Sequence, residues 1–278
     1  MGQKASKVNV WEFEPVMNPS DLAEIFRTRL GATQPKLQIE LFDADLMRSN
    51  LDLMYASLKE ARAIAARAGA PQNARDAVMA LYNVKLDELS QLFPVFFLFE
   101  SAFRTFTAAR LKTVYGDDEW WKPIRDALAA NRDLRRLHRL GNLPARRDVV
   151  DTVAHLLTGM GRGAARVVTS YDLLEGGTLA HVERLIDAHW SAVDQALRHD
   201  PTQAKLTGTT FTNLFKVVRN ARNDAYHHRS VQHRARVVAI AEQLLDMLDM
   251  SLRTHVIAVA KAPVPQLTFA IAVEPRHG

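Results

Sequence analysis

One helical stretch of unusual length constrains the fold of this chain most. Residues from about Ala74 to Tyr115 carry a helical pattern, and Gly116 follows them as a helix-ending residue. Proline removes an intrahelical hydrogen bond and clashes with the preceding turn, so we expect a break or kink near Pro94. With only 12 glycines and 11 prolines among 278 residues, the chain suits long regular elements.

Further helices are predicted on both sides of this stretch from apolar residues at helical spacing. One runs over about 43–67 and ends before Gly69 and Pro71, and a shorter one runs from Asp21 to Gly31. A loop over 117–123 leads into another helix. The remaining predicted helices span 145–158, 178–199, 209–226 and 230–261.

The order of these elements predicts the fold class. Strands do not alternate with helices, which argues against an α/β enzyme and favours an all-α helical bundle. The extended segments 8–13 and 266–273 allow at most a minor strand pairing of the termini. We predict three parts: an N-terminal helical extension over 1–72, a bundle over 73–262 and a tail over 263–278.

Composition limits the chemistry and the compartment. Hydrophobic residues make up 47% of the chain, which is enough to bury a core. The chain has no cysteine, so disulfides, thiolate metal sites and cysteine nucleophiles are excluded, and a cytoplasmic protein is expected. No run of about 18 apolar residues occurs, so we expect neither a transmembrane helix nor a membrane partner.

Two stretches concentrate the positive charge of a chain whose net charge is +5. Residues 131–147 hold six arginines and one acid, Asp133, and residues 216–236 hold five arginines and one lysine against one acid, Asp224. Two solvated helix faces are the simpler interpretation. If the fold brings the stretches together, they form one phosphate-binding surface.

Two other features carry little functional signal. The segment 159–163 resembles a phosphate loop, but such loops follow a strand, and this one follows a predicted helix. It therefore indicates a helix end. His228 and His233 lack a further ligand at short helical spacing. We accordingly predict no metal and no cofactor.

The strongest functional signal is a dense polar block, 222–228, that directly follows an apolar helix. On an ideal helix Arg219, Asn223 and His227 lie within about 80° of one face, whereas Arg222 lies about 140° from His227. The long side chain of Arg222, or a fraying helix end, must bring the two groups together. A structural hydrogen-bond cluster at a helix end is the alternative interpretation.

These residue types suit RNA cleavage. RNA carries its own nucleophile, the 2′-hydroxyl, and its attack on the adjacent phosphate needs a base of near-neutral pKa, such as histidine. A guanidinium stabilises the negative charge that the phosphate gains in the transition state. Asn223 can orient the histidine or hold a phosphate oxygen. This chemistry requires no metal ion.

The same residues resemble a family. Arg222 and His227 fit the Arg-x4–6-His signature of the HEPN ribonucleases, including the polar residue Asn223 after the arginine. The string 222–229 looks especially like the Arg-Asn-x-x-x-His-His-x-Arg segment of the Abi-like, abortive-infection branch. The segment 99–104, with Glu and Arg four apart, is similar to an early helix of that branch. Tyr115-Gly116 and Trp120-Trp121 are similar to the segment after it, and the resemblance covers roughly residues 75–260.

The resemblance implies a fold and an activity. HEPN proteins are helical bundles that form homodimers with a composite active site, and many are metal-independent endoribonucleases in phage defence, toxin–antitoxin pairs or RNA decay. RNA is therefore the expected partner, together with a possible protein antitoxin. Some HEPN domains instead bind without cleaving, and a non-catalytic module that binds RNA, a nucleotide or a partner protein is the alternative.

The resemblance also implies residue roles. Arg222 is expected to stabilise the phosphate, His227 to act as general base or acid, and Asn223 to support them. His228 is the alternative to His227, because a spacing of five residues is also allowed. The residues expected to bind substrate or organise the cleft are Arg219, Tyr226, Arg229, Glu100 and Arg104.

Two of these expectations have a competing interpretation. Glu100 and Arg104 are equally compatible with a buried structural ion pair. Tyr226 departs from the Abi-like pattern, which more often has a small residue before the histidine pair. It is expected either to crowd the cleft or to stack on a base. Trp120 and Trp121 are more typical of a core than of base stacking.

Overall fold

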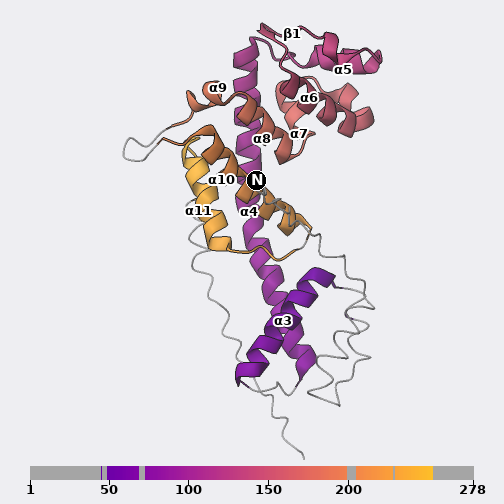
Figure 1. The fold of residues 1–278 in the computed structure, drawn as a ribbon. Helices are drawn as coiled ribbons and strands as arrows, with labels where there is room; N and C mark the ends of the chain where they lie inside the picture. The colour runs from indigo at the N-terminus through magenta and orange to yellow at the C-terminus, as the bar shows by residue number, and fades with distance from the viewer. Residues whose placement is uncertain (1–44, 46–48, 69–72, 199–204, 228, 253–278) are drawn as a thin grey trace, which may run out of the picture. The chain divides into compact units, whose positions relative to one another are not determined.

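Figure 1 shows the computed structural model of the chain, which describes residues 45, 49–68, 73–198, 205–227 and 229–252. This part is mostly helical and contains one two-stranded hairpin, which confirms the all-α prediction. Its longer helices are α3 (Leu51–Ala68), α4 (Ala74–Tyr115), α5 (Lys122–Ala129), α6 (Arg147–Met160), α8 (Leu179–Ala188), α10 (Gly208–Tyr226) and α11 (Arg234–Asp246). The short elements are η1 (Leu134–Arg136), β1 (Arg139–Leu140), β2 (Leu143–Pro144), η2 (Gly161–Arg166), α7 (Ser170–Glu175) and α9 (Trp190–Asp194).

The chain divides into two compact units. The first comprises residues 1–87, 228–230 and 265–278, and the second comprises 88–227 and 231–264. The predicted three-part division remains a prediction, because residues 69–72 and 253–278, where its two boundaries fall, lie outside the described residues. The predicted helix over 21–31 and the predicted pairing of the termini lie outside them as well.

In the first unit, α3 packs against the beginning of α4. Its apolar residues Leu53, Met54 and Leu58 are buried, as their helical spacing requires. The helix was predicted from about residue 43; Asp45 is helical, but residues 49 and 50 are not, and α3 begins at Leu51. Asn50 sets this start, because its side-chain oxygen accepts a hydrogen bond from the Leu53 backbone N–H at 3.0 Å, as an N-cap residue does.

The second unit is organised around aromatic contacts between α4 and α10. Phe99 lies 5.0 Å from Phe215, and Phe103 lies 5.1 Å from Phe215 and 5.9 Å from Phe211, measured between ring centroids. All four rings are buried. Helix α10 also packs against α8 and α11, and Arg234 at the start of α11 pairs with Glu88 of α4 (Figure 1). These contacts fix α10, which carries the polar block.

A second cluster of the same unit surrounds the end of α4. Tyr115 stacks on Trp120 with ring centroids 4.5 Å apart, and both tryptophans are buried, so Trp120 and Trp121 belong to the core. The hairpin β1–β2 packs on this cluster through the buried side chain of Leu140. Its turn, Gly141-Asn142, is a typical hairpin dipeptide, although the helical patterning around it gave no prediction of strands.

Helix α4 continues through Pro94, so the predicted break is wrong. Pro94 is exposed, whereas Leu92, Val95 and Phe96 beside it are fully buried. A proline in a helix interior costs about 3 kcal/mol. Fully burying one large apolar side chain contributes about 1.5–3 kcal/mol. The three burials together therefore outweigh the cost of the proline and keep the helix continuous.

Two other helices are shorter than predicted. The predicted helix 178–199 divides at His189 into α8 and α9. The His189 ring hydrogen-bonds the Leu185 carbonyl and the Tyr115 hydroxyl, each at 2.8 Å, and holds the chain in the turn. The predicted helix 230–261 is described as α11 only, and Asp249 beyond its end has a left-handed φ of 59°.

By length and composition, α4 is the one helix in the described part that is apolar enough to cross a membrane. Half of its most apolar window is buried inside the protein, and core helices of this kind pass the same test. The expectation that the protein has no membrane partner therefore remains a prediction.

Two buried histidines predict how stability depends on pH. Burial lowers the pKa of both His181 and His189 from the ordinary value of 6.5. As the pH falls through 6.5, these residues take up protons in the unfolded chain before they do so in the folded one. The free energy of unfolding should therefore decrease below pH 6.5, by at most about 1.4 kcal/mol per pH unit for each histidine.

Urea unfolding of the wild type and of His189→Gln between pH 7.5 and 5.5 measures this slope. The variant is expected to lose stability less steeply than the wild type. His138→Gln, a change at an exposed histidine, is the control and should keep the wild-type slope. Equal slopes for the wild type and His189→Gln would show that His189 does not contribute to the pH dependence of the free energy of unfolding.

Candidate functional site at the end of helix α10

Helix α10 places the polar block at its exposed end. Phe211, Phe215, Val218, Ala221 and Ala225 recur three and four residues apart and are buried, so they form the inner face. Asn223, Tyr226 and His227 are therefore left exposed. The helix ends at Tyr226, and the His227 backbone N–H still donates to the Asn223 carbonyl at 3.0 Å.

Arg222 is held from two sides. Its Nε donates to Oε2 of Glu100 at 2.9 Å, and its guanidinium carbon lies 3.9 Å from the centre of the Tyr226 ring. The Tyr226 ring in turn contacts Phe93 of α4 edge-on, with centroids 5.4 Å apart. The Arg222 side chain is 26% exposed, so an ordered guanidinium remains accessible to a ligand.

Glu100 owes its position to Arg104, which lies one turn further along α4. Nη2 of Arg104 lies 2.5 Å from Oε1 of Glu100, so the carboxylate bridges two guanidiniums. Arg104 is 7% exposed and also donates to the backbone carbonyls of Leu174, Glu175 and Gly177. These carbonyls lie at the end of α7, where a helix leaves acceptors unsatisfied. The position of Arg104 is therefore that of an organising residue, with its donors used inside the protein.

Two glycines allow the loop after α7 to reach Arg104. A Cβ atom at Gly176 would lie 2.0 Å from a Met160 side-chain atom, and one at Gly177 would lie 2.8 Å from a Leu156 side-chain atom. The loop therefore packs more closely on α6 than other residues permit. The dipeptide signals a turn in the sequence, but nothing local indicates that its carbonyls receive a buried arginine.

His227 is exposed, and its imidazole has no hydrogen-bond partner among the described residues. His228, the alternative catalytic residue, lies outside them. Within the described part of this one chain, no hydrogen bond joins Arg222 to His227, whereas Nη1 of Arg222 lies 3.4 Å from the Asn223 side-chain oxygen. The assignment of these four residues to catalysis remains a prediction.

Arg219 and Arg229 have other partners. Nη1 of Arg219 lies 2.5 Å from the Glu183 carboxylate, and both side chains are largely buried between α10 and α8. Burial raises the pKa of Glu183, and the charge of Arg219 opposes this shift. Glu183 was not singled out from the sequence. Arg229 belongs to the first unit, where its exposed guanidinium lies 3.7 Å from Asp52.

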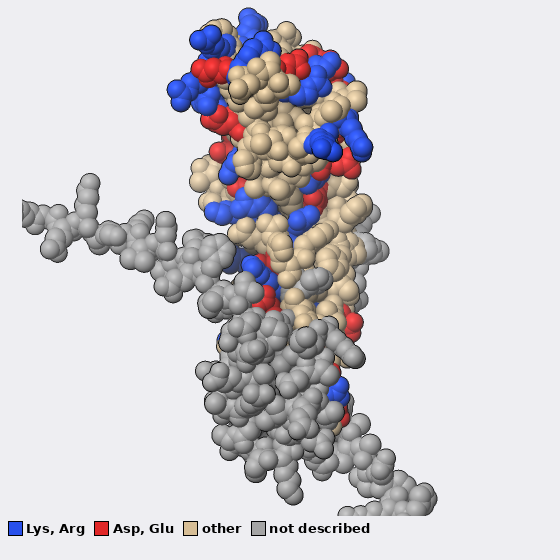
Figure 2. Space-filling model, turned by 90° about the vertical axis from the view of Figure 1, so that its right-hand side faces the viewer, with Lys and Arg blue, Asp and Glu red and all other residues tan. Residues whose placement is uncertain are grey.

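The two arginine-rich stretches thus differ in the structure. In the second stretch, Arg219, Arg222 and Arg234 pair with Glu183, Glu100 and Glu88. In the first stretch most arginines are exposed and have no carboxylate partner among the residues that the structure describes. Figure 2 shows Lys and Arg side chains gathered at the end of the second unit where Figure 1 places β1 and α5.

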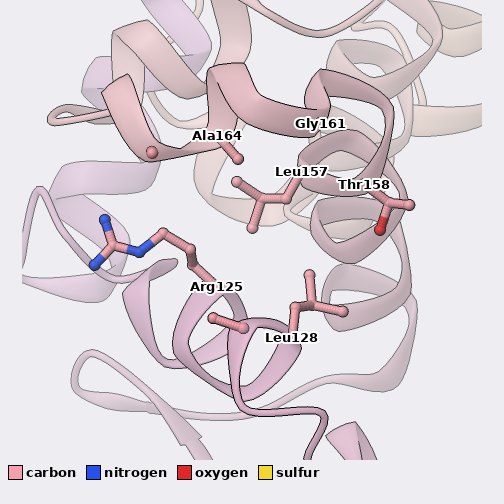
Figure 3. A pocket seen from close by; sticks show the side chains of 8 residues that line it. Arg125, Leu128, Leu157, Thr158, Gly161 and Ala164 are labelled. Carbon is pink, nitrogen blue, oxygen red and sulfur yellow. The ribbon is translucent and has the colours of Figure 1, made fainter.

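A pocket of about 480 Å³ lies between α5, α6 and η2, and none of the predicted site residues lines it. Figure 3 shows Leu128 and Leu157 at its centre and the polar side chains of Arg125 and Thr158 on opposite sides. The Arg125 guanidinium pairs with Asp126 and lies over Trp121. In the described parts of both units, no three His, Asp or Glu side chains are grouped so as to hold a metal ion.

Comparison of the chain with protein-family models, with curated proteins and with solved structures gives no match. A functional assignment therefore depends on the geometry of the site and on the sequence motif. The geometry separates two arginines: Arg104 is buried and uses its donors inside the protein, whereas Arg222 is partly exposed.

Charge removal at Glu100 and at Arg222 should have unequal effects on stability. Glu100→Gln leaves the buried Arg104 guanidinium without a carboxylate, so it should lower the free energy of unfolding by about 3 kcal/mol. Arg222→Gln leaves the Glu100–Arg104 pair intact and should cost about 1 kcal/mol or less. Urea unfolding measures both values.

Glu88→Gln is the matched control, because it removes the carboxylate of a more exposed pair with Arg234. Its effect should be as small as that of Arg222→Gln. If Arg222→Gln destabilised the protein as much as Glu100→Gln, Arg222 would be a structural residue and the site would lose its functional interpretation.

Proposed function

We propose that the protein is a metal-independent endoribonuclease that cleaves RNA through attack of the 2′-hydroxyl, and that it acts as a toxin or phage-defence effector. One observation supports this most directly. A guanidinium fixed by Glu100 and Tyr226 lies near the exposed end of α10, in the same polar segment of the chain as Asn223 and His227. The role of the cleavage in defence comes from the resemblance to Abi-like HEPN proteins.

The charge around Arg222 suits a phosphate. One carboxylate, Glu100, lies between two guanidiniums, so the group of three keeps a net positive charge. Arg222 is the more exposed of the two arginines, and Glu100 accepts from its Nε. The Nη edge, where Nη1 makes only a long 3.4 Å hydrogen bond to Asn223, is therefore available for planar, charge-assisted hydrogen bonds to phosphate oxygens.

The reaction needs one proton acceptor and one proton donor. A histidine takes the proton of the 2′-hydroxyl while its oxygen attacks phosphorus. The bond from phosphorus to the 5′-oxygen then breaks, and that oxygen takes up a proton. The products are a 2′,3′-cyclic phosphate and a 5′-hydroxyl. His227 is accessible for this role, and Arg222 would stabilise the charge that develops on the phosphate.

A second copy of the chain would complete the site. Phe97 is 70% exposed, and at 100° per residue it shares one face of α4 with Phe93, Glu100 and Arg104. An exposed phenyl group beside an ordered Arg–Glu pair suits the centre of an interface. We propose a two-fold dimer in which Arg222 of one protomer meets His227 of the partner subunit.

A non-catalytic RNA-binding module is the second candidate. It is favoured by the lack of a contact between Arg222 and His227 in the described residues of one chain. In that case the fixed guanidinium would bind a phosphate without cleaving next to it. The two candidates differ in the role of His227: the nuclease needs it for proton transfer during cleavage, whereas the binding module does not cleave.

Cleavage of a labelled RNA in EDTA tests the proposed reaction. The wild type should release fragments that end in 2′,3′-cyclic phosphate. His227→Ala should slow cleavage about 10²–10⁴-fold, and Arg222→Ala about 10²–10³-fold, while both variants stay folded. Arg236→Ala, at an exposed arginine of α11, should cleave like the wild type. A need for added metal would rule out this mechanism, and binding with no cleavage at any enzyme concentration would favour the second candidate.

The molar mass in solution tests the dimer. Phe97→Lys would place a charge at the centre of the proposed interface, so light scattering should show a shift from dimer to monomer, with loss of cleavage. Leu86→Lys, at another exposed apolar position of α4, is the control and should remain dimeric. A wild type that is monomeric and fully active at every concentration would contradict a shared site.

A further inference from the structure

Six arginines at one end of the second unit have no carboxylate partner in the described part of the chain. They lie before η1, on η1, on β1 and on η2, and all are exposed: Arg132, Arg135, Arg136, Arg139, Arg162 and Arg166. Elements η2 and α5 line one pocket, and η1 packs against α5, so these elements belong to one region. We refer to the six residues as the basic end; Figure 2 shows blue Lys and Arg side chains, with some red acidic ones among them, at this end of the second unit.

The backbone that carries the basic end is anchored. Leu140 of β1 is fully buried, and the Asn142 backbone N–H donates to the Tyr115 carbonyl at 2.9 Å. Gly116 and Gly141 adopt left-handed φ values of 69° and 51°, which lets α4 and the hairpin turn approach each other. Arg139 therefore projects from a fixed hairpin, and the packing of η1 on α5 and of η2 on α6 holds the segments of the other arginines, which reduces the ordering cost of binding a ligand.

The acids near the basic end are already in use. The Asp133 carboxylate accepts a hydrogen bond from the Arg135 backbone N–H and begins η1. Asp148 pairs with Arg146, and Asp151 pairs with Arg147. The six arginines consequently form no ion pair among the described residues, and their positive charge can attract an anionic partner.

We propose that the basic end docks the phosphate backbone of RNA at a place separate from Arg222. This inference rests on the proposed function, and it adds a second contact for the same substrate. Residues 131–147 contain six arginines and no lysine. Guanidinium groups bind phosphates through a planar pair of donors, whereas attraction to a charged membrane surface needs only point charges, so the composition favours RNA.

The length of α4 gives the separation of the two contacts. Arg222 is bonded to Glu100, and the hairpin turn is bonded to Tyr115 fifteen residues further along the same helix. At a rise of 1.5 Å per residue these points are about 22 Å apart along the axis. An RNA of several nucleotides is therefore needed to touch both, so docking would select for long RNA without reading its bases.

The salt dependence of binding tests the proposal. The probe is a 20-nucleotide 2′-O-methyl RNA, which has no nucleophile and stays intact whether or not the protein is a nuclease. Arg135→Gln/Arg136→Gln should lower the slope of log affinity against log salt by about 1.4, because each phosphate contact contributes about 0.7. At 0.1 M salt the affinity should fall on the order of 20-fold.

Lys59→Gln/Arg67→Gln removes the same charge from exposed positions of α3 and should leave affinity and slope unchanged. If both double variants behave alike, or if anionic lipid vesicles are bound and RNA is not, the docking surface is overturned. Arg222→Ala in the same assay measures how much the proposed nuclease site itself contributes to RNA binding, separately from the basic end. RNA binding that depends on Arg135 and Arg136, without any cleavage by the wild type, would keep the docking surface and reject the nuclease.

Discussion

The arrangement of the second unit depends on the hydrogen bonds and the ion pair of one buried guanidinium, that of Arg104. A permanently charged group that is 7% exposed requires partners, because an isolated buried charge is prohibitively costly. Arg104 finds them in the carbonyls at the end of α7 and in the Glu100 carboxylate. One side chain of α4 therefore fixes the loop between α7 and α8 and also orients the carboxylate that reaches α10.

The same network determines what the end of α10 presents to solvent. Glu100 holds Arg222 by its Nε, and Tyr226 supports the flat face of the guanidinium. Tyr226 is the residue that departs from the Abi-like pattern, and it was expected to crowd a cleft or stack on a base. In the structure its ring contacts both Arg222 and Phe93, and the expectation about the cleft and the base remains a prediction. A small residue there would leave the guanidinium without this support, so the departure is consistent with an ordered site.

The sequence predicted the helices well where periodicity and helix-ending residues agree, as for α4, α6 and α10. It failed where tertiary contacts override local preference: packing of neighbouring apolar residues carries α4 through Pro94, and His189 divides one predicted helix in two. Arg222, Asn223 and His227 could be proposed as a site from the sequence because they lie close together in the chain. The contact of Arg222 with Glu100 spans 122 positions, and no local pattern reveals it.

The two arginine-rich stretches show that the sequence also does not reveal which charged side chains are paired. In the sequence they look alike, each with several arginines and a single acid. In the structure, carboxylates from distant segments neutralise much of the second stretch, and those pairs hold α10 and α11 in place. Helix α8 supplies one of these carboxylates and α4 supplies two, whereas the hairpin region receives none from a distant element in the described residues. Charge that stabilises the bundle and charge left for a ligand are therefore distinguished only by the fold.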